Sequence, residues 1–178
     1  MRAAWTDHST TLILALLVLP LAGVAAYRWR RRARSGRAAL AEVGLLCWTL
    51  PFIGMLFTPR PTPRSIDLVP LHDLPSWFSG APGTAAAQLI GNLAVLAGVG
   101  FFLPIRYGWA ASYQRITALA VGCAVLIETL QWVLAIGRVS SVDDVIINTL
   151  GAVAAAICSR RWWIMQKADN EGQMVPVP

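Results

Sequence analysis

The amino-acid sequence predicts an all-α protein, a polytopic bundle of about five transmembrane helices with its N-terminus outside and its C-terminus in the cytoplasm. Three observations predict this class. Of the 178 residues, 56% are hydrophobic and 13% are charged, whereas a soluble domain carries about 25% charged residues. Apolar runs of about 20 residues, the length that crosses a hydrocarbon core, recur along the chain. Basic residues gather between these runs, as they do in cytoplasmic loops.

The first predicted span covers residues 10–27. It is a retained helix and not a signal peptide, because its positive charge follows the apolar run instead of preceding it. The stretch RWRRRARSGR at residues 28–37 stops transfer and forms a cytoplasmic loop that meets anionic headgroups. Residues 1–39 are therefore a transmembrane helix with its basic loop, and the main membrane domain begins at residue 40.

That domain is predicted to extend over residues 40–161 and to contain four spans, at residues 40–57, 85–103, 116–136 and 144–158. A proline-rich stretch at residues 58–84 is expected to be an external loop without regular structure. Residues 162–178 are expected to form a disordered cytoplasmic tail. Eleven of the fifteen Lys and Arg residues then lie inside, and four lie outside: Arg2, Arg60, Arg64 and Arg138.

Composition also argues against several functional classes. The net charge of +6 is concentrated in one loop between apolar runs, and no folded basic module for nucleic acid is present. The cysteines, Cys47, Cys123 and Cys158, are isolated within apolar stretches, and the two histidines are far apart. These spacings indicate no disulfide framework and no metal site. No cofactor is expected.

Seven polar residues in or beside the last three spans are the candidate binding site: Asn92, Glu128, Gln131, Arg138, Asp143, Asp144 and Asn148. The helix rise places Glu128 about 13 Å below the turn at Gly137, and Asn92 about 10 Å into its span. We expect these side chains to line an outward-facing polar cavity. A charge at this depth costs at least about 2.5 kcal/mol, so Glu128 is the strongest functional candidate.

Structural roles are open for some of these residues. The patterns Ser140-x-x-Asp143 and Ser141-x-x-Asp144 precede an apolar run and fit helix capping. Asn92 and Asn148 could bridge helices as amides do in membranes. Glu128 could pair with Arg138, but about two and a half helical turns separate them.

Several stretches resemble the VanZ-like family of membrane proteins. The main one is LIETLQWVLAIGRVSSVDDVIINTLGA, residues 126–152, which combines a Glu and a Gln, a Gly-Arg turn, an Asp-Asp start and an Asn-Thr-Leu-Gly run. Similar family segments are TLPF at residues 49–52, IDLVPL at 66–71 and GNLAVLAGVGFFLP at 91–104. The last one lacks a proline that the family usually has near Ala97, which could alter a kink. The resemblance covers about residues 40–161.

The resemblance implies a multi-pass protein of the bacterial cytoplasmic membrane. The family's namesake is associated with low-level resistance to the glycopeptide teicoplanin. We therefore expect the cavity to bind the polar head of membrane lipids, of a lipid-linked cell-wall precursor or of a lipophilic glycopeptide. Arg138 would meet an anionic group, and Glu128 would accept a cation or a proton. Hydrogen bonds would come from Gln131, Asn92 and Asn148.

Two alternatives stay open. An intramembrane enzyme acting on a lipid-linked substrate would use Glu128 as general base with Asp143 or Asp144, although about 10 Å of depth separates Glu128 from Asp144. No catalytic residue is therefore assigned. A structural partner of another envelope protein would present the small-residue face of the last span, around Gly151, as its interface.

Overall fold

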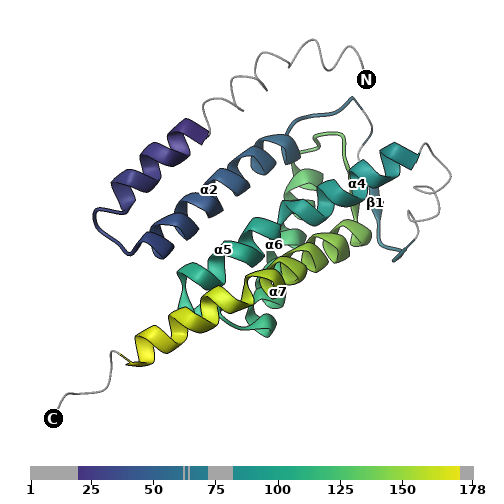
Figure 1. The fold of residues 1–178 in the computed structure, drawn as a ribbon. Coiled ribbons are helices and arrows are strands. Elements are labelled where there is room, and N and C mark those ends of the chain that lie inside the picture. Colours follow the sequence, from purple (N-terminus) through teal and green to yellow (C-terminus); the bar gives the residue numbers. More distant parts are fainter. Residues whose placement is uncertain (1–19, 62, 64, 72–81, 173–178) are drawn as a thin grey trace.

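The computed structural model describes residues 20–61, 63, 65–71 and 82–172, and it is mostly helical (Figure 1). Four helical segments of this part are long and apolar enough to cross a membrane: Gly36–Leu56, Gln88–Arg106, Tyr113–Val133 and Val142–Met165. The predicted first span begins outside the described residues. Its second part, from residue 20, is helical to residue 30 and lies beside the next helix in Figure 1.

After the helix that ends at residue 30, the described part of the chain has six helices and two short strands. They are α2 (Gly36–Leu56), β1 (Ser65–Asp67), α4 (Pro82–Val95), α5 (Ala97–Arg106), the 3-10 helix η1 (Gly108–Ala110), α6 (Tyr113–Val133), β2 (Val139–Ser141) and α7 (Val142–Gly172). Helix α7 is central, because it packs on α4, α5 and α6, while α2 packs on α5 (Figure 1). Much of the apolar surface of α2 and α6 remains exposed, as expected for helices that face lipid.

Small residues let the helices approach closely around α7. A methyl group at Gly100 would overlap the backbone carbonyl of Ala152, and one at Gly151 would overlap that of Leu93. Such close approach of backbones is the usual way in which membrane helices gain packing energy. The Gly151 face that was predicted as an interface for another protein is therefore covered by α4 of the same chain.

The predicted third span is broken into α4 and α5 at Leu96, although the chain has no proline at this point. A break leaves backbone carbonyls without helical partners, and in lipid each such group costs several kcal/mol. Trp48 of α2 compensates, because its indole Nε1 donates a hydrogen bond to the Ala94 carbonyl at 2.8 Å. Its ring lies where a side chain at Gly98 would stand. The helix is thus interrupted near Ala97 without the family's usual proline, and a tryptophan from another helix bonds at the break.

Strand β2 returns into the bundle after α6. Helix α6 ends three residues earlier than the predicted residue 136, and Ala135 (φ 50°) and Gly137 (φ 69°) adopt left-handed backbone conformations that turn the chain. β2 then pairs in parallel with β1, with Ser65 opposite Val139 and Asp67 opposite Ser141. The expectation of a proline-rich loop without regular structure is therefore wrong for β1, whose hydrogen-bonding partner is distant in sequence.

Helix α7 is longer than the predicted fifth span and continues through Gly172. The disordered tail expected from residue 162 is therefore wrong for residues 162–172, and residues 173–178 lie outside the described part. Aromatic packing explains the extension. The ring of Trp162 lies 5.5 Å from that of Phe101, and the ring of Trp163 lies 5.6 Å from that of Tyr113, edge to face.

Candidate functional site

The end of the bundle that carries the β1–β2 pair gathers the predicted polar residues. Together with Ser140 and Ser141, these seven residues are here called the polar cluster. Their positions follow from the return of β2, which brings the start of α7 back against the end of α6. Buried members include Glu128 (8% exposed), Gln131 (3%), Asp143 (1%) and Asn148 (1%).

Glu128 is held by the residues that open α7. Its Oε2 accepts a hydrogen bond from the Ser141 amide at 3.2 Å, and the Ser140 hydroxyl donates to its backbone carbonyl at 2.9 Å. The carboxylate therefore lies against the backbone that leads into the positive end of the α7 dipole, which stabilises negative charge. Sequence spacing alone had separated Glu128 from Asp144 by about 10 Å in depth. In the fold, Glu128 bonds to Ser141, the last residue of β2, three positions before Asp144 in the sequence.

The two aspartates at the start of α7 join three distant segments. Asp143 Oδ1 accepts the Leu71 amide at 2.5 Å, and Leu71 has a positive φ of 64°. Asp144 accepts a hydrogen bond from the Asn92 amide of α4. The Ser141 hydroxyl accepts the Asp143 amide at 3.1 Å, so a serine does cap this helix, as the S-x-x-D patterns indicated. Capping and inter-segment bonding occur together here.

Arg138 sits at the edge of the polar cluster, where the charges of four residues act on one another. Its Nη2 donates to the Met55 carbonyl at 2.6 Å. Burial lowers the pKa of Arg138, and the positive charge of Arg60 lowers it further, whereas Glu128 and Asp144 act in the opposite direction. Arg60 is fixed nearby by its amide, which donates to the Ile136 carbonyl at 2.8 Å. An anion bound between the two guanidinium groups would relieve their mutual repulsion.

Two amides that were expected to serve a ligand are engaged within the protein. The Gln131 amide donates to the Leu56 carbonyl at 3.1 Å, and the Asn92 amide donates to Asp144. Other groups have capacity left: within the described part of the chain, Asn148 Oδ1 and Arg138 Nε are buried and make no hydrogen bond. A buried polar atom without a partner costs about 1–3 kcal/mol, so each would gain from a bound ligand or water.

Several residues of the polar cluster are buried and bond to one another or to nearby backbone. Among the described residues, no group of three His, Cys, Asp or Glu side chains could hold a metal ion. The arrangement can bind hydroxyl or amine protons at its carboxylates and an anionic group at Arg138 and Arg60. Ser140, Ser141 and the Leu71 amide were missed, although the S-x-x-D patterns marked the two serines.

A second charged group, the half-buried carboxylate of Glu42, lies at the opposite end of the bundle and was not predicted from the sequence. Glu42 of α2 contacts Arg106 of α5, and Arg30 and Arg34 lie at 3.4 and 3.5 Å. We call these four residues the arginine clamp. The sequence feature that could have predicted this clamp is a lone Glu in an apolar run shortly after an Arg-rich stretch. The clamp joins residues 20–30, α2 and α5.

Comparison with known proteins agrees with this architecture. No curated protein and no solved structure matches the chain. The VanZ/LLP1 family profile matches residues 10–165, which include every residue of the polar cluster and of the arginine clamp. The match also includes residues 10–39, which the resemblance of individual motifs did not cover. The chain is therefore a multi-pass membrane protein that belongs to the VanZ/LLP1 family.

Proposed function

We propose that this protein acts in the cell envelope by binding the polar head of a lipid-linked molecule at the polar cluster, and that it thereby lowers susceptibility to teicoplanin-type glycopeptides. The observation that carries the proposal is a set of polar groups at the β1–β2 end: the buried Glu128 carboxylate, a buried Asn148 oxygen without a hydrogen bond, and Arg138 with Arg60 near it. Polar and charged groups cost free energy inside a membrane, so their presence there indicates a functional site. The association of VanZ proteins with teicoplanin supports the envelope role.

The chemistry of the cluster suggests the kind of head group. Arg138 and Arg60 suit a phosphate or carboxylate at the membrane surface. Glu128 and the Asn148 oxygen accept hydrogen bonds, and hence suit hydroxyl or amide N–H groups of a sugar or peptide. A lipid-linked cell-wall precursor carries both kinds of group, and so does a lipophilic glycopeptide. In this proposal the β1–β2 end of the bundle faces outward, as the distribution of Lys and Arg predicts.

Teicoplanin susceptibility tests the proposal. A sensitive bacterial host would express wild type, Glu128→Gln or Arg138→Gln at matched membrane levels, with vancomycin as the less lipophilic control drug. We expect wild type to raise the inhibitory concentration of teicoplanin and both variants to lose most of that effect, because each removes a charge from the cluster. Full protection by both variants would show that resistance to teicoplanin does not depend on the polar cluster. No protection by wild type would refute the resistance role.

Catalysis on a lipid-linked substrate is a second candidate, and one observation favours it. The 3.2 Å bond from the Ser141 amide to Glu128 brings this carboxylate to the start of α7, where Asp144 also lies. General acid–base chemistry needs such groups within reach of one substrate. Incubation of the purified chain with a lipid-linked wall precursor would test this. Turnover that Glu128→Gln abolishes would support an enzyme, and an unchanged precursor would exclude it for that substrate.

A further inference from the structure

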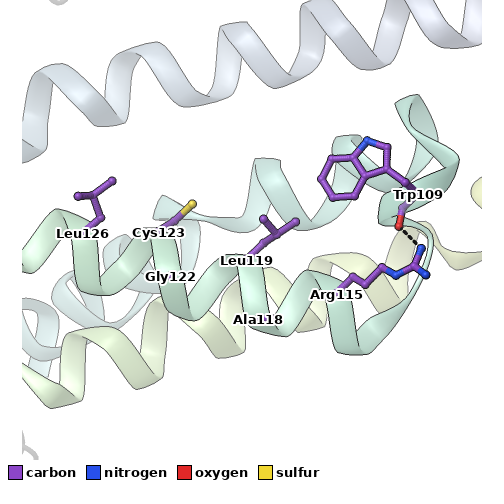
Figure 2. A pocket seen from close by; sticks show the side chains of 7 residues that line it. All are labelled: Trp109, Arg115, Ala118, Leu119, Gly122, Cys123 and Leu126. Carbon is purple, nitrogen blue, oxygen red and sulfur yellow. Dashed lines mark hydrogen bonds between the residues drawn. The ribbon is translucent and has the colours of Figure 1, made fainter.

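An apolar pocket on the membrane-facing side of α6 lies outside the polar cluster (Figure 2). Its volume is 430 Å³, within the range of about 300–1,000 Å³ that small-molecule sites occupy. The floor is a stripe of small and aliphatic side chains from α6: Ala118, Leu119, Gly122, Cys123 and Leu126. In Figure 2, Leu119, Cys123 and Leu126 point to the side on which the Trp109 ring lies. We call this pocket the α6 groove.

One end of the α6 groove is charged and aromatic, and the rest is apolar. Arg115 and Trp109 complete the lining. The Arg115 guanidinium donates from Nη1 to the Trp109 carbonyl at 2.6 Å, a contact drawn as a dashed line in Figure 2. A guanidinium has five N–H donors, so this bond leaves donors for a ligand. Trp109 is 54% exposed, and exposed tryptophans favour the level of lipid headgroups.

The dimensions of the groove fit one leaflet of a bilayer. Arg115 and Leu126 are eleven positions apart on α6, which corresponds to about 16 Å at the helical rise. A hydrocarbon core of about 30 Å gives each leaflet half of that thickness. A lipid whose phosphate meets Arg115 would therefore lay one acyl chain along the stripe as far as Leu126.

The positive charge around Arg115 favours anionic lipids over zwitterionic lipids. Arg115 lies at the start of α6, a short connection after Arg106 and the arginine clamp. Basic pockets beside membrane helices recognise anionic headgroups, and basic residues mark the cytoplasmic leaflet. We infer that the α6 groove binds a single anionic phospholipid of this leaflet, with the phosphate at Arg115 and an acyl chain over Gly122. This site is separate from the polar cluster, and its test does not depend on the proposed function.

Gly122 allows a clean test, because a side chain there would enter the groove without a clash. No atom lies within 4 Å of the position that its Cβ would take, and the same holds for Gly54 on α2. Gly122→Leu should fill the groove, while Gly54→Leu makes the same chemical change elsewhere. Arg115→Gln should remove the headgroup contact but keep the apolar stripe.

The experiment is native mass spectrometry of the purified full-length chain in detergent, titrated with dioleoyl phosphatidylglycerol or dioleoyl phosphatidylcholine. We expect wild type and Gly54→Leu to retain one phosphatidylglycerol about tenfold more tightly than phosphatidylcholine, because both lipids offer Arg115 a phosphate but the choline of phosphatidylcholine carries a positive charge that Arg115 repels. Gly122→Leu should lose both lipids about tenfold, and Arg115→Gln should bind both equally. Retention of phosphatidylglycerol by Gly122→Leu, or equal binding of both lipids by wild type, would overturn the assignment. So would a dimer that Gly122→Leu dissociates without changing lipid binding.

A second measurement covers the case in which Gly122→Leu does not fold. Cys123 lines the groove, so a chain in which Cys47 and Cys158 are replaced by alanine reports its occupancy through alkylation. Phosphatidylglycerol should slow maleimide labelling of Cys123 several-fold more than phosphatidylcholine does. Equal labelling rates in the two lipids would contradict the proposal.

Discussion

Glu128 shows how one residue can be buried in an apolar helix without being isolated. Its carboxylate accepts the Ser141 amide, and the Ser140 hydroxyl bonds to the Glu128 backbone carbonyl, so strand β2, which returns into the bundle after α6, lies against it. The residues that permit this return are Ala135 and Gly137, both with positive φ. The geometry of the polar cluster thus depends on backbone conformations that most residues avoid.

Substitution at these two turn positions should have opposite effects. We expect Gly137→Ala to lower the free energy of unfolding by about 1–2 kcal/mol, because an alanine strains a left-handed backbone by that amount. Ala135→Gly should be neutral or slightly stabilising for the same reason. Thermal unfolding of the purified chain in detergent measures both. Equal effects of the two changes would refute this explanation of the turn.

Trp48 offers a second prediction at the level of one residue. Trp48→Phe keeps an aromatic ring at Gly98 but removes the indole donor that bonds to the Ala94 carbonyl. Because that carbonyl lies at the helix break and would be left without a partner away from water, we expect a loss of about 1–3 kcal/mol in stability. Chemical unfolding in detergent would measure the change. Unaltered stability would mean that the break is satisfied in another way.

At the scale of elements, helix α7 organises the bundle because its small residues contact the backbones of α4 and α5. Gly151 meets Leu93, and Ala152 meets Gly100. Exposed aliphatic side chains on α2, α6 and α7 then face outward. This division differs from a soluble bundle, in which large apolar side chains fill the centre.

Methyl groups at the contact glycines should therefore disrupt the bundle. Gly100→Ala and Gly151→Ala should each lower the free energy of unfolding by about 1–3 kcal/mol or more, since overlap with backbone cannot be relieved by a rotamer change. Gly54→Ala is the matched control, because no atom lies within 4 Å of its Cβ position. If all three variants unfolded at the same temperature as wild type, the close contacts of α7 would not contribute to stability.

The positions of the last four predicted spans agree with the four candidate membrane helices, because each depends on a local property, the length of an apolar run. The seven polar residues could likewise be recognised locally, because they stand out against their apolar surroundings. Other features depend on partners distant in sequence. The break at Leu96 involves Trp48, β1 pairs with β2, and Leu71 bonds to Asp143. Periodicity and helix rise contain no information on such pairings, so they could not predict the bond between the Ser141 amide and Glu128.

At the scale of the whole molecule, the two ends of the bundle have different chemistry. The β1–β2 end carries the carboxylates and amides of the polar cluster, with Arg138 and Arg60 at its edge. The opposite end carries the arginine clamp, Arg115 and the Arg-rich stretch at residues 28–37. This asymmetry predicts the orientation of the protein, with the second end in the cytoplasm.

Labelling of single cysteines would test this orientation. In a chain whose native cysteines are replaced by alanine, Ala33→Cys should react with a membrane-impermeant maleimide only after the cells are permeabilised. Pro61→Cys should react in intact cells, because Pro61 lies between the end of α2 and β1, at the end of the bundle that carries the β1–β2 pair. Both positions are exposed in the structure. The reverse pattern of labelling would place the polar cluster in the cytoplasm and exclude an outward-facing site.

Binding of a lipid-linked cell-wall precursor to the chain in nanodiscs tests the role of the polar cluster most directly. We expect wild type to bind, and Glu128→Gln and Arg138→Gln to bind at least about tenfold more weakly, since each loses a charged contact. Gly122→Leu, which alters only the α6 groove, should bind like wild type. If the two charge variants bound as tightly as wild type while Gly122→Leu did not, the head group would bind outside the polar cluster and the proposed site would be wrong.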